Sequence, residues 1–274
     1  MSLFITSLAS GSNGNCYYIA NQNEAVLIDA GISCREIEKR MKRLKLDIHS
    51  VKAILISHEH SDHIRGVHVL AKKYQIPVYA TEQTAHASNI SSENNPVIYF
   101  DPAEKIVIGS LIITSFKKAH DACDPYSFVI NHGNVHVGVF TDIGVPCANL
   151  INHFKICDAA FLEANYDDEM LDAGNYPYFL KQRIRGGNGH LSNKQALEVF
   201  KQNRPANMSH LFLAHLSKNN NCPKLVENLF KTDCNGIEIV VASRDMETPV
   251  YFIGAEDPQK VILARQMMVQ QSLF

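Results

Sequence analysis

The sequence lacks the features that would place the chain in or across a membrane. No run reaches about 18 apolar residues, the length that a membrane-spanning helix needs. Residues 1–5 are not a basic segment leading into a long apolar stretch, so no signal peptide is predicted. An excess of one charge is also missing, with 26 Lys+Arg against 28 Asp+Glu and a formal net charge of −2. A chain-wide basic surface is therefore excluded, and any contact with nucleic acid must be local.

Paired cysteines are missing as well. The seven cysteines are odd in number and form no CxxC motif, which is typical of a reducing cytoplasm rather than of a disulfide scaffold or a cysteine-rich zinc module. We therefore expect a cytoplasmic protein. Hydrophobic residues make up 46% of the 274 residues and charged residues 20%, so the chain can bury a substantial core. The unusual component is histidine, with 13 residues.

The order of the predicted elements favours an α/β fold. Near the N-terminus, three short apolar runs alternate with turn compositions and predict strands at residues 4–9, 16–20 and 25–29. Helices are predicted to begin at Ser33 and Ser192, because an acid or amide follows each in capping-box spacing. The chain is rich in strands at both ends and mixed between them, with no linker or repeat. This order predicts two packed sheets with helices outside, in one domain of residues 1–274.

A cluster of histidine and aspartate follows the apolar strand predicted at residues 53–57. It reads His58-Glu59-His60-Ser61-Asp62-His63. Residues two apart in extended backbone project to the same side, so His58 and His60 can converge on one cation. Asp62 is predicted at a helix N-cap, and the turn there brings it and His63 toward a second position. Imidazole nitrogens and a carboxylate suit Zn²⁺, Fe or Mn²⁺, so the cluster predicts a metal site.

The HxHxDH pattern at the end of a strand resembles the signature of the metallo-β-lactamase superfamily. Four further residues match that pattern in order across residues 29–215. Asp29 ends an early predicted strand, and His120 ends a later one. Asp142 follows another predicted strand, and His215 follows a late one. The resemblance implies a four-layer αββα sandwich of two mixed β-sheets flanked by helices.

The resemblance also implies a centre with two divalent metal ions, Zn²⁺ first and Mn²⁺ or Fe as alternatives. One ion would be held by His58, His60 and His120, and the other by Asp62, His63 and His215. Asp142 would bridge the two ions, and Asp29 would orient a ligand histidine from outside. Two such cations lower the pKa of a shared water, and the bridging hydroxide attacks the substrate.

His190 competes with His215 for the last ligand position. It lies two residues before the helix predicted from Ser192, where backbone N–H groups favour an anion. We favour His215 as the ligand, because it ends a strand as the other ligands do. His190 would then steady a phosphate or protonate the leaving group, and a histidine that merely bonds its own loop is the alternative. Asp62, His190 and Asp29 are thus the predicted catalytic residues.

Finer motifs resemble one branch of the superfamily, the YycJ/WalJ-like proteins. They include Ser10-Gly11-Ser12-Asn13-Gly14-Asn15, the run through Leu162-Glu163-Ala164-Asn165, and Gly189-His190-Leu191-Ser192-Asn193. The branch implies a metal-dependent phosphodiesterase that acts as a DNA nuclease, with 5′→3′ exonuclease action. A hydrolase of small cyclic phosphodiesters or thioesters, and a non-catalytic nucleic-acid-binding regulator, are the alternatives. Self-association as a homodimer stays open.

Several residues are candidates for binding the substrate, each with a plainer alternative. The small polar loop 10–15 could bind a phosphate through backbone N–H groups or be an ordinary hairpin turn. A basic segment before His190 could bind a polyanion or be a solvated helix face. The candidates are Ser12, Asn13, Gly14, Asn165, Arg183 and Arg185. The basic residues of the helix predicted from Ser33, Arg40 among them, are interpreted as a solvated face.

Overall fold

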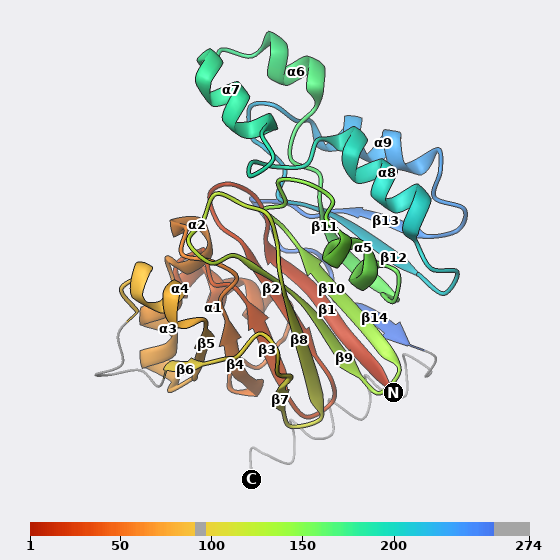
Figure 1. Cartoon of the computed structure of the whole chain (residues 1–274). Coiled ribbons are helices and arrows are strands. Elements are labelled where there is room, and N and C mark those ends of the chain that lie inside the picture. The colour runs from red at the N-terminus through yellow and green to blue at the C-terminus, as the bar shows by residue number, and fades with distance from the viewer. Residues whose placement is uncertain (91–96, 255–274) are drawn as a thin grey trace.

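Two seven-stranded sheets pack face to face in the computed structural model, which describes residues 1–90 and 97–254. Residues 91–96 and 255–274 belong to the predicted domain of 1–274 and lie outside the described residues. Figure 1 shows the sheets side by side, with helices on both outer faces. The predicted α/β sandwich of four layers is therefore confirmed.

The first sheet has the strand order β14-β1-β2-β3-β4-β5-β6. Its strands are β1 (Ser2–Ala9), β2 (Cys16–Ala20), β3 (Ala25–Ile28), β4 (Val51–Leu55), β5 (Val78–Ala80), β6 (Val97–Tyr99) and β14 (Tyr251–Gly254). The neighbours β3, β4, β5 and β6 pair in parallel, whereas β1 pairs antiparallel with both β14 and β2. Helices α1 (Cys34–Arg43), α2 (Ser61–Ile64), α3 (Val67–Tyr74) and α4 (Glu82–Ala87) belong to this half. A 3-10 turn, η1 (Ile48–Ser50), precedes β4.

The second sheet has the strand order β13-β12-β11-β10-β9-β8-β7. Its strands are β7 (Ile106–Ile108), β8 (Leu111–Lys117), β9 (Tyr126–His132), β10 (Val135–Phe140), β11 (Ala159–Glu163), β12 (His210–Ala214) and β13 (Glu238–Val241). Helices α5 (Ala148–Phe154), α8 (Asn193–Asn203) and α9 (Pro223–Lys231) cover its outer face, and α6 (Asp168–Ala173) and α7 (Tyr178–Arg185) project beyond it (Figure 1). The strands β10, β11, β12 and β13 are parallel, so their carboxyl ends meet at one edge.

Three apolar clusters hold the layers together. The central cluster joins the two sheets, with Ile5 and Ile28 of the first against Phe128 and Phe161 of the second. Because successive side chains of a strand point to opposite faces of the sheet, each sheet also has an outward apolar face. On each side, the helices pack against this face and form an outer cluster with it. Among the described residues, no helix is long and apolar enough to cross a membrane.

The predicted helix starts are confirmed. The Ser33 hydroxyl accepts a hydrogen bond from the N–H of Glu36, and Ser192 forms the full capping box of α8 with Gln195. The helix α1 ends at Arg43. The prediction that its basic residues form a solvated face is wrong for one of them, Arg40. Arg40 is only 6% exposed, because its guanidinium bonds three backbone carbonyls of other segments.

The helix that carries the metal motif differs from the prediction. The segment after β4 forms two helices, α2 and α3, which are separated at Gly66. A Cβ on Gly66 would stand 2.1 Å from the carbonyl oxygen of Ile32, so only glycine lets the chain pass this close to the loop after β3. The N-cap of α2 is His60 rather than Asp62, which therefore lies inside the first turn.

Candidate metal centre

The predicted metal-binding residues gather at the edge where the parallel strands end. Asp29 follows β3, Asp142 follows β10 by two residues, and His215 follows β12. Each of these three has a positive φ, between 54° and 61°. Aspartate and histidine adopt this left-handed backbone more readily than most residues, and the sharp turn aims the side chain back across the strand end.

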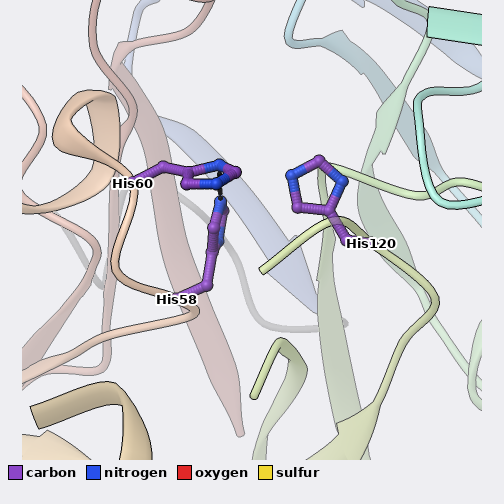
Figure 2. A group of neighbouring side chains, drawn as sticks. All are labelled: His58, His60 and His120. Carbon is purple, nitrogen blue, oxygen red and sulfur yellow. Dashed lines mark hydrogen bonds between the residues drawn. The ribbon is translucent and has the colours of Figure 1, made fainter. Parts of the chain in front are cut away.

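One group of donors consists of three histidines from both sheets. The nitrogens of His58, His60 and His120 lie within 4.8 Å of one another. Figure 2 shows His120 facing the other two histidines. The Nε2 atom of His58 lies 3.1 Å from the Nδ1 atom of His60. The Nε2 atom of His120 is buried and has no hydrogen-bond partner among the described residues. A buried nitrogen left without a partner is costly, so this geometry suits a bound cation.

A second group lies beside the first. Asp62, His63 and His215 bring their donor atoms within the same 4.8 Å limit. The Oδ2 atom of Asp62 is 3.5 Å from Nε2 of His63 and 3.5 Å from Nε2 of His215. The structure thus brings His215, and not His190, together with Asp62 and His63.

Asp142 lies between the two groups. Its Oδ2 atom is 3.1 Å from Nε2 of His63, and its Oδ1 atom is 3.7 Å from Nε2 of His120 and 3.5 Å from Nδ1 of His215. The carboxylate therefore reaches donors of both groups, which is the position that a bridging ligand requires.

Asp29 acts on the cluster from behind. Its Oδ2 atom is 2.7 Å from Nδ1 of His63, and its other oxygen accepts the N–H of Ser57 at 2.8 Å. A carboxylate on Nδ1 fixes the orientation of the ring and leaves Nε2 directed at the cluster. Asp29 thus lies where it can orient His63, which is the role that the resemblance implies for it.

Glu163 is a buried residue of the site that the sequence analysis did not single out. One of its oxygens lies 2.9 Å from Nδ1 of His190 and 2.8 Å from Nδ1 of His215. The other accepts the backbone N–H groups of Ile143 and Leu191. The sequence did carry a signal, because Glu163 is an acid at the end of a buried strand, as Asp29 is. Burial raises the pKa of Glu163, but His190 and His215 outweigh it and bring the pKa to about 2.

The charges of the cluster fit a divalent cation. Burial lowers the pKa of His58 well below its usual value, and it lowers that of His120 to about 4, so both imidazoles are neutral. Burial also opposes ionisation of Asp142, but His215 and His63 outweigh it and hold the pKa of this carboxyl well below its usual range. Neutral imidazoles and ionised carboxylates are the forms that coordinate metal ions. The other two imidazoles differ. Burial lowers the pKa of His63 and of His215, but the nearby carboxylates, Asp142 first, outweigh it, and the pKa of His215 rises to about 10.

The predicted substrate-binding residues have different surroundings. Ser12 and Asn13 are exposed on the loop between β1 and β2, whereas Gly14 is buried against Ile32. Asn165 is 4% exposed, and its amide donates to the backbone carbonyl of His215 at 2.8 Å, so it supports that histidine.

Both arginines before His190 are engaged in ion pairs. Arg183 meets Asp121 at 2.5 Å, and Arg185 of the same helix meets Asp172 at 2.5 Å. Their charges are therefore largely balanced within the protein itself.

Comparison with known proteins now identifies the family. The family model described as the Beta-lactamase superfamily domain matches residues 24–215. The chain belongs to this superfamily. It also belongs to the YycJ/WalJ-like branch, because it is 36% identical over 228 residues to a protein of Bacillus anthracis named exodeoxyribonuclease YycJ, covering 82% of this chain and 86% of that protein.

Two further similarities agree. A Streptococcus pneumoniae protein named exodeoxyribonuclease WalJ is 34% identical over 256 residues, covering 89% of this chain and 95% of its own length. The solved structure of the metallo-β-lactamase fold protein YhfI from Bacillus subtilis has a TM-score of 0.72 at 20% identity, covering 92% of this chain and all (100%) of that one. The predicted superfamily and branch are both confirmed.

Proposed function

We propose that this protein is a metal-dependent DNA nuclease with 5′→3′ exonuclease action. One observation carries the proposal: a full set of histidine and carboxylate donors converges at the strand ends of a chain whose relatives are named exodeoxyribonucleases. A protein that only binds nucleic acid has no need for so many buried, converging donors.

We infer that two divalent cations occupy the centre, with Zn²⁺ as the first candidate and Mn²⁺ or Fe as alternatives. Two observations support this inference. The Nε2 atom of His120 has no hydrogen-bond partner within the described part of the chain, and Asp142 lies between two donor groups. His58, His60 and His120 would hold one ion, Asp62, His63 and His215 the other, and Asp142 both. When bound, two such cations lower the pKa of a shared water and neutralise charge on the phosphate oxygens.

The protein's own residues have separable tasks in this proposal. Asp29 and Glu163 fix His63 and His215 by bonding their Nδ1 atoms. Glu163 does the same for His190, whose Nε2 is then free to give a proton to the leaving oxygen. The His190 side chain is 21% exposed, so a substrate can reach it.

Three further parts of the proposal concern the protein as a whole. The cytoplasm is the compartment that suits it best, because all seven cysteines are free thiols. We infer that residues 1–274 form one domain. Association into a homodimer is a prediction that sedimentation of the purified protein would test.

The test is turnover on 5′-labelled single-stranded and duplex DNA, with bis(p-nitrophenyl) phosphate and a thioester beside them. Each reaction is run with Zn²⁺ or Mn²⁺, using His60→Ala as the inactive variant. His86→Ala is the matched control, because this histidine on α4 is 75% exposed and lies outside the donor groups.

Metal-dependent release of nucleotides from the 5′ end, lost in His60→Ala and kept in His86→Ala, is the expected result. Hydrolysis of only the small esters would move the substrate to a metabolite and overturn the nuclease. Binding of DNA without cleavage under every metal condition would favour the regulator.

A further inference from the structure

Two arginines from distant parts of the sequence meet at the loop between β1 and β2. Arg65 donates to the backbone carbonyl of Asn13 at 3.2 Å, and Arg244 donates to the side-chain oxygen of Asn13 at 3.2 Å. Arg244 also donates to the carbonyl of Leu216. Within the ranges that the structure describes, no carboxylate forms an ion pair with either guanidinium.

Both arginines lie beside one half of the candidate metal centre. Arg65 caps the C-terminal end of α2, the helix that carries Asp62. Leu216, which accepts from Arg244, directly follows His215. The loop itself reaches the cluster through Asn15, whose side-chain nitrogen is 3.2 Å from an oxygen of Asp62. The two positive charges therefore border the group of Asp62, His63 and His215.

The position of Arg244 is fixed from behind by a buried arginine. Arg40 donates to the carbonyl of Leu8 at 2.6 Å, to that of Arg244 at 3.3 Å and to that of Asp245 at 3.1 Å. These bonds tie the loop after β13 to the end of β1. Because side chains that are already ordered lose little entropy on binding, such a site binds more tightly than a mobile one.

A glycine makes the close approach of Arg244 feasible. Gly11 has φ +147°, and a Cβ there would stand 3.2 Å from the Cζ atom of Arg244. The guanidinium therefore lies close against the loop at Gly11. The N–H groups of Ser12 and Asn13, both exposed, have no acceptor among the residues that the structure describes.

The contrast with α7 decides which cations are available to a polyanion. Arg183 and Arg185, the candidates from the sequence, already face Asp121 and Asp172. Among the described residues, the hydrogen bonds of Arg65 and Arg244 all go to neutral oxygens. A guanidinium offers paired donors that match phosphate oxygens, so an unneutralised pair beside a hydrolytic centre is suited to a phosphate group.

We propose that Arg65 and Arg244, together with the N–H groups of Ser12 and Asn13, form a clamp for one phosphate group of the nucleic-acid strand, next to the diester held at the metal centre. This inference rests on the proposed nuclease function and names how the same site grips its substrate. It predicts that a substrate with several phosphates depends on the clamp, whereas a single isolated diester does not.

The experiment compares Arg65→Gln, Arg244→Gln and the double variant on a single-stranded oligonucleotide and on bis(p-nitrophenyl) phosphate. Lys105→Gln is the control for charge loss, because Lys105 is exposed just before β7 and lies outside the donor groups. Each arginine variant is expected to raise KM for the oligonucleotide about tenfold, as the loss of a charge-assisted hydrogen bond does. The kinetics on bis(p-nitrophenyl) phosphate and the behaviour of Lys105→Gln should stay unchanged.

Two further arms make the result decisive. Arg244→Lys keeps the positive charge but lacks the paired donors of the guanidinium. It should recover only part of the affinity that Arg244→Gln loses, and this partial recovery separates a loss of binding from misfolding. Substrates with a 5′-phosphate or a 5′-hydroxyl show which phosphate is held. If removing the 5′-phosphate reproduces the loss in the wild type, the clamp holds the terminal phosphate, and if not, an internal one.

The two ways of failing are distinguishable. If the wild type cleaves the oligonucleotide and both arginine variants keep its KM, the clamp is wrong and the nuclease stands. If the wild type hydrolyses no nucleic acid at all, the proposed function fails, and the clamp fails with it. A KM that rises equally for bis(p-nitrophenyl) phosphate would also overturn the clamp, because the arginines would then serve the reacting diester itself.

Discussion

The two sheets contribute to the candidate centre in different ways. The first sheet supplies His58, His60, Asp62 and His63 from one continuous segment after β4. The second supplies its donors one at a time, from the ends of separate strands across about a third of the chain: His120, Asp142 and His215. A contiguous motif is positioned by local geometry, whereas the scattered donors are positioned only by the strand register of the folded sheet. The second half should therefore depend more on supporting residues such as Glu163.

The largest effect is expected at Asp142, where the two halves meet. Because its carboxylate reaches donors of both groups, Asp142→Ala should lose both cations, whereas His60→Ala should lose one. Activity on DNA should fall by more than about a hundredfold, beyond the loss usual for a supporting residue. Elemental analysis after dialysis would count the bound metal. Equal metal content in Asp142→Ala and the wild type would refute the bridging position.

The next effect compares the two supporting acids. Among the described residues, Asp29 directly bonds the ring of one histidine, His63, whereas Glu163 bonds the rings of both His215 and His190. Asp29→Asn and Glu163→Gln should each reduce kcat/KM by about 10–100-fold, with Glu163→Gln the more damaging. Metal affinity should fall in both variants. Only Glu163→Gln should also steepen the dependence of kcat on leaving-group acidity, because a misoriented His190 no longer helps poor leaving groups by protonating them. The same steepening in Asp29→Asn would refute this division of tasks.

A smaller effect concerns stability rather than activity. Gly31 lies in the loop after β3, and a Cβ there would stand 1.6 Å from the carbonyl oxygen of Asp62. Gly31→Ala should therefore cost about 1–3 kcal/mol of unfolding free energy, as overpacking does. Gly187→Ala, before His190, is the matched control, because its Cβ would meet only Val145 at an ordinary 3.7 Å. Urea denaturation of the two variants gives the comparison, and equal stabilities would contradict it.

The difference between the two sheets also decides how much of the site could be predicted from the sequence. The segment from His58 to His63 could be recognised from spacing alone, and the resemblance placed the scattered donors. Glu163 was missed because its one signal, an acid at the end of an apolar strand, is not reinforced by a second residue at a set spacing. The clamp was missed because Arg244 and Gly11 lie at opposite ends of the sequence, and only the fold brings them together. The same holds for Arg40, which reads as a surface residue until the carbonyls that it bonds are known.

The smallest effect tests a polar bridge between the two sheets. Glu24, in the turn before β3, accepts hydrogen bonds from Asn21 and from the backbone and side chain of Ser110 in the turn before β8. Burial raises the pKa of Glu24, but these hydrogen bonds outweigh it and lower the pKa below 4.5. A depressed pKa gives stability that is present above the unfolded value and is lost as pH falls through the folded value. The wild type should thus be slightly more stable than Glu24→Gln near neutral pH.

That difference should disappear as the pH falls below 4.5, which thermal melts at several pH values would show. A difference that persists unchanged into acid would mean that the charge of Glu24 does not contribute.

The most direct test of the account is a metal titration of the metal-free protein, followed by cleavage of 5′-labelled single-stranded DNA. If the two sheets together build a dinuclear centre, nuclease activity should rise with added Zn²⁺ or Mn²⁺ and level off at about two equivalents per chain. The titration should leave His60→Ala inactive throughout. A plateau at one equivalent, or cleavage that does not depend on metal, would contradict the account.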